Sequence, residues 1–164
     1  MATQTKEKYV QTLLGKPVNE LTRDEQKLVQ VALIFGDFYD LEHRDLHGTA
    51  TTESFDTFIQ MLQVCEQYNN FYSAKVVKVL EKHRDVLDNK IHRMSFGRKG
   101  SPSIEIETGY WKQPELDAFW RDMVKSAKPD EAYGYAYDGT QYGAKFRNKS
   151  LDAEKVRRLT FWWD

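Results

Sequence analysis

Apolar residues recur at helical spacing through the first ninety residues of the chain. In each run they fall three or four positions apart, which places them on one face of a helix. Thr22 and Glu25 have the spacing of a capping box, in which each side chain satisfies a backbone amide at the start of a helix. We expect helices over 6–14, 23–47, 53–68 and 72–92. Because short connections make consecutive helices antiparallel neighbours, this part is predicted to form a bundle.

The pattern changes to strand-like alternation in the second half. Ile104 and Ile106 alternate with Glu105 and Glu107, which predicts a half-buried strand over 103–109. Asp138-Gly139 is typical of a two-residue hairpin turn, and with that turn Tyr135 faces Tyr142 across the hairpin. We expect the hairpin strands over 132–137 and 140–147 and a helix behind the sheet over 114–126. A last short helix is expected over 151–159.

These elements predict an α+β fold. We expect a single domain over 1–164 with two parts. A bundle of about four helices occupies 1–94, and a small antiparallel sheet with a tyrosine-rich hairpin and one packing helix occupies 95–164. No repeat of 20 to 50 residues is present, which argues against a solenoid.

Composition narrows the class of protein. Hydrophobic residues make up 40% of the 164 residues and the net charge is −1, which favours a folded chain over a disordered one. The single cysteine, Cys65, excludes an intrachain disulfide and suits a reducing compartment. The first residues lack the apolar core of a signal peptide, and the longest apolar run, 31–35, is too short to cross a bilayer. We expect a cytoplasmic protein without a membrane partner.

All four histidines lie in two segments that contain His-Arg-Asp, beginning at His43 and His83. The catalytic loop of protein kinases needs an asparagine seven positions after the histidine, but Ala50 and Lys90 stand there. No two glycines are two residues apart, so a glycine-rich phosphate loop is absent, and so is a G-x-S-x-G nucleophile motif. These absences favour a protein that is not an enzyme and carries no cofactor.

A metal site is one alternative. His43 and His47 are four residues apart and share a helix face with Asp40, so two of the three could ligate one ion if another segment supplied further ligands. This arrangement would suit a metal-dependent enzyme. The competing interpretation is a solvated last helical turn, where histidines interact favourably with the negative end of the helix dipole.

Basic residues are concentrated in two segments of the chain, and nucleic-acid binding is therefore a second alternative. Segments 82–100 and 145–158 each carry six basic residues against two acidic ones. Cations would bind phosphates, and tyrosines on one hairpin face would stack on bases. The residues proposed for this role are Arg98, Lys99, Tyr135, Tyr142, Lys145, Arg147, Arg157 and Arg158. The same tyrosines could equally pack on the helices.

Binding to a larger protein is the leading hypothesis. The stretch 36–56 carries six acidic residues against one arginine, and the chain ends in Phe-Trp-Trp-Asp. Exposed aromatics are typical anchors of protein interfaces, although these could also dock into the core. The residues predicted to bind the partner are Asp37, Asp40, Glu42, Asp45, Phe161, Trp162 and Trp163. Small regulators and inhibitors of the kind that phages and mobile elements often make have a similar profile. The likeness is one of general type and not a match to a family.

Overall fold

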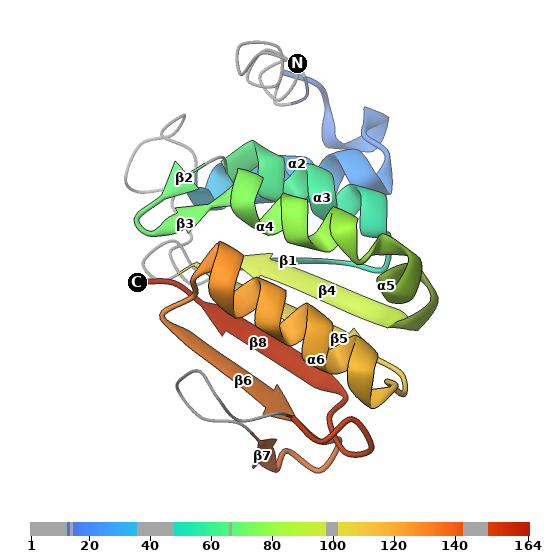
Figure 1. The fold of residues 1–164 in the computed structure, drawn as a ribbon. Helices are drawn as coiled ribbons and strands as arrows, with labels where there is room; N and C mark the ends of the chain where they lie inside the picture. The colour runs from blue at the N-terminus through green and yellow to red at the C-terminus, as the bar shows by residue number, and fades with distance from the viewer. Residues whose placement is uncertain (1–12, 14, 36–47, 66, 98–101, 143–150) are drawn as a thin grey trace.

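An antiparallel sheet of six strands forms the centre of the protein (Figure 1). The computed structural model describes residues 13, 15–35, 48–65, 67–97, 102–142 and 151–164. In spatial order the strands are β1 (Thr49–Thr52), β4 (Ile91–Gly97), β5 (Ser103–Thr108), β8 (Arg158–Trp162), β6 (Glu131–Tyr135) and β7 (Gln141–Tyr142). A separate two-stranded hairpin consists of β2 (Gln67–Tyr68) and β3 (Phe71–Tyr72).

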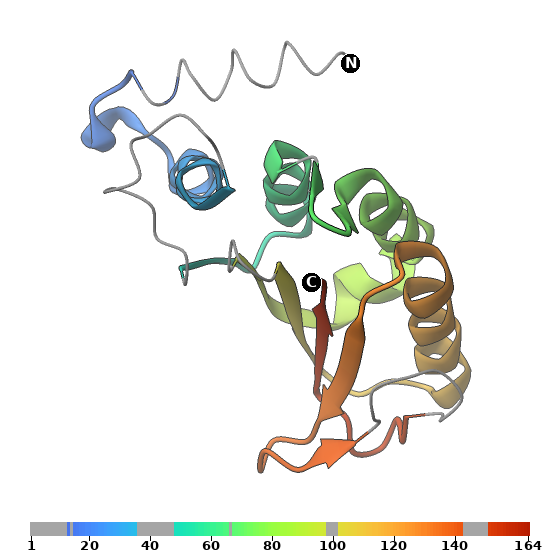
Figure 2. The same cartoon turned by 90° about the vertical axis from the view of Figure 1, so that its left-hand side faces the viewer.

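The helices lie on one face of this sheet (Figure 2). They are η1 (Val18–Glu20), α2 (Arg23–Phe35), α3 (Phe55–Cys65), α4 (Ser73–Lys82), α5 (Arg84–Lys90), α6 (Gln113–Asp122) and the π-helical turn η3 (Met123–Ala127). No helix in the described ranges covers the opposite face of the sheet. Over the same ranges, none of the helices has both the length and the apolar character needed to cross a bilayer.

Alternating side chains of the strands build one hydrophobic core beneath the helices. Phe96 of β4, Ile104 of β5, Phe161 of β8 and Ala132 of β6 lie in one cross-strand row and all are buried. Phe35 of α2 stacks on Phe96 with ring centroids 4.7 Å apart. The row therefore joins strands from both halves of the chain to the helical layer, because buried residues at period two share one face of a sheet.

The predicted N-terminal four-helix bundle is wrong. The helices are interspersed with strands and pack on a sheet, and β1 and most of β4 lie within 1–94, the part expected to form the bundle. The helix expected over 72–92 stops at His83, restarts as α5 and gives way to β4 at Ile91. Met94 and Phe96 alternate with polar residues, and β4 pairs with β1 on one side and β5 on the other. From Ile91 onward, tertiary pairing thus overrides the helical spacing that predicted a helix as far as residue 92.

The predicted helix over 151–159 is also wrong. Turns occupy part of that segment, and β8 then runs in the middle of the sheet between β5 and β6. The sequence from Arg158 to Trp163 alternates between the two faces of the sheet, with Leu159, Phe161 and Trp163 buried. A strand bonded on both sides satisfies every backbone group, which an isolated short helix at this position could not do.

The hairpin turn differs by one residue from the prediction. Gly139 has a φ of 85°, but Asp138 lacks a positive φ, so the loop contains three residues rather than two. Tyr135 therefore pairs with Gln141, and Gly134 pairs with Tyr142. Because a shift of one residue moves a side chain to the other face, Tyr135 and Tyr142 lie on opposite faces.

Several local predictions are confirmed. Thr22 and Glu25 form the capping box of α2, with the amide of Glu25 donating to Thr22 Oγ1 at 3.1 Å and the amide of Thr22 donating to Glu25 Oε1 at 3.0 Å. The strand expected over 103–109 is β5, and the helix expected over 114–126 is α6 followed by η3. The part of the second predicted helix beyond Phe35, at 36–47, lies outside the described residues.

Candidate interaction surface and adjoining pocket

The helix-free face of the sheet presents a mixture of aromatic, charged and small polar side chains. These are the residues that alternate with the buried ones, and most are half-buried. We call them the open face: Arg93 and Ser95 of β4; Glu105 and Glu107 of β5; Arg158, Thr160 and Trp162 of β8; Glu131, Tyr133 and Tyr135 of β6.

Aromatic residues gather on the β8–β6 side of the open face. The rings of Tyr133 and Tyr135 lie 6.3 Å apart between centroids, and the guanidinium of Arg158 lies 4.6 Å over the ring of Tyr135. Trp162 stands across from Glu131. The hydroxyl of Tyr133 donates to Glu131 Oε2 at 2.7 Å, which raises the pKa of Tyr133 because the bond favours the protonated phenol. The aromatic side of the face is therefore held in place by contacts along β6 and β8.

The charges of the open face are mixed. Arg93 Nη2 donates to Glu107 Oε1 at 2.7 Å, and this bond raises the pKa of Arg93. Three carboxylates, on Glu105, Glu107 and Glu131, share the face with two guanidinium groups. The buried Nε of Arg158 and Oγ1 of Thr160 have no hydrogen-bond partner. Buried polar atoms without partners are unfavourable, and neither of these two atoms is exposed for a docking molecule to reach.

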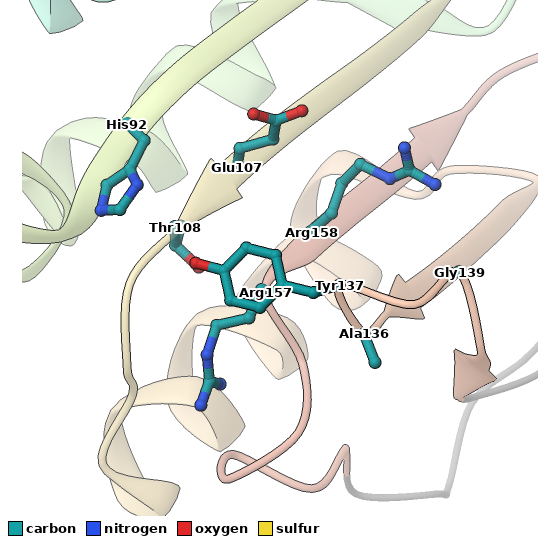
Figure 3. A pocket seen from close by; sticks show the side chains of 8 residues that line it. All are labelled: His92, Glu107, Thr108, Ala136, Tyr137, Gly139, Arg157 and Arg158. Carbon is teal, nitrogen blue, oxygen red and sulfur yellow. The ribbon is translucent and has the colours of Figure 1, made fainter.

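A pocket of about 190 Å³ adjoins the open face at the end of the sheet where β5 finishes and β8 begins (Figure 3). The turn between β6 and β7 forms one side of it. The pocket is lined by His92, Glu107, Thr108, Ala136, Tyr137, Gly139, Arg157 and Arg158. Two of these residues also belong to the open face, so the pocket and the face are continuous.

Arg157 is the most unusual group beside the pocket. It is only 4% exposed, and its guanidinium donates to the main-chain carbonyls of Ala153, Glu154 and Val156 at 2.6 to 3.0 Å. The ring of Tyr110 covers it at 3.7 Å. No carboxylate in the described part of the chain pairs with this guanidinium. A buried positive charge without a counter-charge favours a nearby anion.

The structure separates the residues that were predicted to bind a protein. Phe161 and Trp163 are fully buried, and Trp163 Nε1 donates to the carbonyl of Ala127 at 2.9 Å, so both dock into the core. Trp162 lies between them on the open face. Asp37, Asp40, Glu42 and Asp45 lie outside the described residues.

The residues predicted for nucleic-acid binding are also dispersed. Arg158 and Tyr135 are in contact on the open face, whereas Tyr142 packs against the core from the other side and Arg157 is buried. The remaining four, Arg98, Lys99, Lys145 and Arg147, lie outside the described residues.

The predicted metal ligands Asp40, His43 and His47 lie outside the described residues as well. Within the described ranges, no group of three or more His, Cys, Asp or Glu residues has the geometry to hold an ion. The other two histidines have different surroundings. His83 Nε2 lies 2.7 Å from Asp122 Oδ2, and His92 lines the pocket.

Tyr110 was not predicted as a surface candidate, and Arg93 was counted only within the basic segment 82–100. Tyr133 and Tyr137 were expected on the tyrosine face of the hairpin but were not named among its binding residues. The alternation of Glu131–Tyr135 and of Arg158–Trp163 carried part of the signal, because period two assigns Tyr133, Tyr135, Arg158 and Trp162 to one face. Nothing in the local sequence indicated that β6 and β8 would be neighbours.

Comparison of the chain with protein-family models, curated proteins and solved structures found no match. The open face and its pocket are therefore the features that bear on function.

Proposed function

We propose that this chain is a non-enzymatic protein-binding module, a small cytoplasmic regulator or inhibitor that docks its open face on a larger protein. The observation that carries the proposal is the group of Trp162, Tyr133, Tyr135 and Arg158 on a sheet face without a covering helix in the described ranges. Trp, Tyr and Arg are the residue types that dominate binding energy in protein interfaces. The cytoplasmic location in the proposal draws support from the single cysteine, which suits a reducing compartment.

The charge of the open face favours a protein over a nucleic acid. Affinity for nucleic acid comes largely from cations that neutralise phosphates. Glu105 and Glu131 would repel phosphates on the open face, and Arg93 is already paired with Glu107. Mixed charges around half-buried aromatics instead match the polar rim and aromatic centre of a protein interface.

The test is affinity capture of the tagged full chain from the cells that make it, followed by binding measurements with the purified partner. Tyr133→Ser removes an aromatic ring from the open face. Tyr72→Ser is the matched control, because Tyr72 is 40% exposed and lies in the β2–β3 hairpin. We expect Tyr133→Ser to raise the dissociation constant at least about tenfold, which corresponds to about 1.4 kcal/mol of lost binding free energy. We expect Tyr72→Ser to leave the dissociation constant unchanged.

Three results would overturn this proposal. The first is the absence of any protein enriched over a tag-only control. The second is a partner whose affinity is the same for the unmodified chain, Tyr133→Ser and Tyr72→Ser. Capture that disappears after nuclease treatment would likewise contradict it and would favour the nucleic-acid alternative.

A further inference from the structure

The pocket at the end of the open face has an excess of positive charge. Arg157 and Arg158 both line it, and their side chains leave the chain in different directions (Figure 3). Arg157 bonds only to neutral carbonyls, and Arg158 lies over the ring of Tyr135. Neither guanidinium forms an ion pair with another described residue.

Glu107 does not neutralise this excess, although it also lines the pocket. It stands directly across from Arg158 in the β5–β8 register and across from Arg93 in the β4–β5 register. Its carboxylate bonds to Arg93 at 2.7 Å and forms no ion pair with Arg158. Because the charge of Glu107 is already matched, the attraction of the two remaining guanidinium groups for an anion is preserved.

Two exposed tyrosines flank this charge. Tyr110 is 76% exposed and covers Arg157, and Tyr137 is 77% exposed and lines the pocket. Of the large hydrophobic side chains in the described ranges, only Tyr72 is also exposed, at 40%. Tyrosines beside a cationic pocket offer a partner apolar contact next to an ionic one, which is the composition of interface hot spots.

We propose that the pocket receives the carboxylate of a glutamate or aspartate side chain from an acidic segment of the partner protein. The guanidinium of Arg158 donates to the carboxylate, Arg157 adds to the positive potential, and Tyr110 and Tyr137 pack on the flanking part of the segment. The volume of about 190 Å³ is below the roughly 300 Å³ at which small-molecule pockets begin, which suits one side chain rather than a cofactor. This inference rests on the proposed function, because it names the kind of protein segment bound.

The experiment is a nuclear magnetic resonance titration of the full chain with a capped peptide of glutamates. A capped peptide of glutamines of the same length and inorganic phosphate are the comparison ligands. The resonances observed are the Nε–H groups of Arg157 and Arg158 and the amide of Gly139. We expect the glutamate peptide to shift these resonances in a saturable manner that weakens with salt, and the glutamine peptide to leave them unchanged.

Three variants refine the titration. Arg158→Gln is expected to weaken binding of the glutamate peptide at least about tenfold, and Arg158→Lys to restore part of it, because the charge returns without the planar group. Tyr137→Ala is expected to weaken binding severalfold. Since Tyr137 is largely exposed, this variant keeps the proposal testable even if Arg158→Gln does not fold.

The proposal is overturned if the pocket resonances do not respond to the glutamate peptide, or if they respond equally to the glutamine peptide. It is also overturned if phosphate binds and the peptide does not, since the pocket would then be a site for a free oxyanion. The two proposals fail separately. A purified partner that binds through Tyr133 but is indifferent to Tyr137→Ala refutes only the acidic-segment inference. A pocket that binds the peptide in a chain that captures no partner refutes only the proposed function.

Discussion

The imidazole Nε2 of His83 lies 2.7 Å from Oδ2 of Asp122. His83 is the residue between α4 and α5, and Asp122 is the last residue of α6. The same carboxylate oxygen lies 2.8 Å from Nζ of Lys82. The contact ties the joint between two helices to the end of a third, which explains why one of the two His-Arg-Asp segments has a structural role here.

The contacts of Asp122 with Lys82 and His83, which we call the Asp122 cluster, predict that the carboxylate of Asp122 stabilises the fold. Burial raises the pKa of Asp122, but the hydrogen bonds from Lys82 and His83 outweigh it and hold the pKa below its usual value. Asp122→Asn is therefore expected to lower the free energy of unfolding by about 1 kcal/mol at pH 7. Urea denaturation measures this loss of unfolding free energy. Asp88→Asn is the control, because the carboxylate of Asp88 is exposed on α5, and it should change the free energy by less than about 0.5 kcal/mol.

The same cluster fixes the direction of the pH dependence. A carboxyl group with a lowered folded-state pKa adds stability above its unfolded pKa of about 3.9, and this contribution is lost as pH falls through the folded value. The difference between the unmodified chain and Asp122→Asn should thus be largest above about pH 5 and shrink at acid pH. A difference that grew as the pH fell below about 5 would contradict the assignment.

The two tryptophans near the C-terminus should contribute very differently to stability. Trp163 is fully buried, packs edge-on against Phe71 at 5.1 Å between centroids and donates to the carbonyl of Ala127. Trp163→Ala is expected to lower the free energy of unfolding by about 3 to 5 kcal/mol. Trp162→Ala on the open face should lower it by about 1 kcal/mol or less. Circular dichroism during urea denaturation measures the free energy of unfolding of both variants without using tryptophan fluorescence. Equal losses of unfolding free energy in the two variants would refute the placement of these side chains.

Arg157 should stabilise the turn before β8 through hydrogen bonds rather than ion pairs. Removal of its three bonds to main-chain carbonyls in Arg157→Ala is expected to reduce the free energy of unfolding by about 3 kcal/mol. Arg157→Lys should recover little of this, because one ammonium group cannot replace a planar fork. Lys155→Ala in the same turn, with a side chain 57% exposed, is the control.

Salt dependence separates this role from an ion pair. Because the partners are neutral carbonyls, the loss in Arg157→Ala should be nearly the same in low salt and in about 0.5 M salt, where exposed ion pairs are screened. A loss that disappeared in high salt would show that the stabilising partner is a carboxylate.

Gly97 should be intolerant of a side chain because of the neighbouring strand. A Cβ there would lie 2.2 Å from the carbonyl oxygen of Gly48 and 2.6 Å from Cα of Thr49, and both are backbone atoms. Gly97→Ala is expected to lower the free energy of unfolding by about 2 kcal/mol or more and to speed hydrogen exchange in β1. Gly109→Ala, where the nearest atom is His92 Nε2 at 3.4 Å, should change stability by less than about 1 kcal/mol. Equal effects at the two glycines would contradict the close approach of β1 to β4.

Part of the interaction surface could be read from the sequence. Tyr135 was named from the alternation of the hairpin, Arg158 from the basic segment 145–158 and Trp162 from the aromatic stretch Phe-Trp-Trp-Asp. Their grouping could not be predicted, because it depends on β8 lying beside β6. The one-residue difference in the hairpin loop likewise moved Tyr142 to the side opposite Tyr135, an outcome that depends on the φ of Asp138 and Gly139.

The sequence by itself determined the elements whose stabilising contacts are local. The capping box of Thr22 and Glu25 starts α2, and α6 begins with Pro114 in its first turn. The alternation around Ile104 and Ile106 indicated β5 as well, although the strands that stabilise it, β4 and β8, are remote in sequence. Each of these signals acts between residues only a few positions apart.

The tertiary structure alone decided the sheet and the surface built on it. Gly97 pairs with Thr49, and Trp162 pairs with Ser103 and with Glu131. The backbone groups of a strand find their hydrogen-bond partners in remote segments, so a short alternating stretch becomes a strand only when those segments assemble beside it. For that reason Arg158–Trp162, which the sequence placed in a helix and a tail, forms a central strand of the sheet and presents Arg158 and Trp162 on the open face.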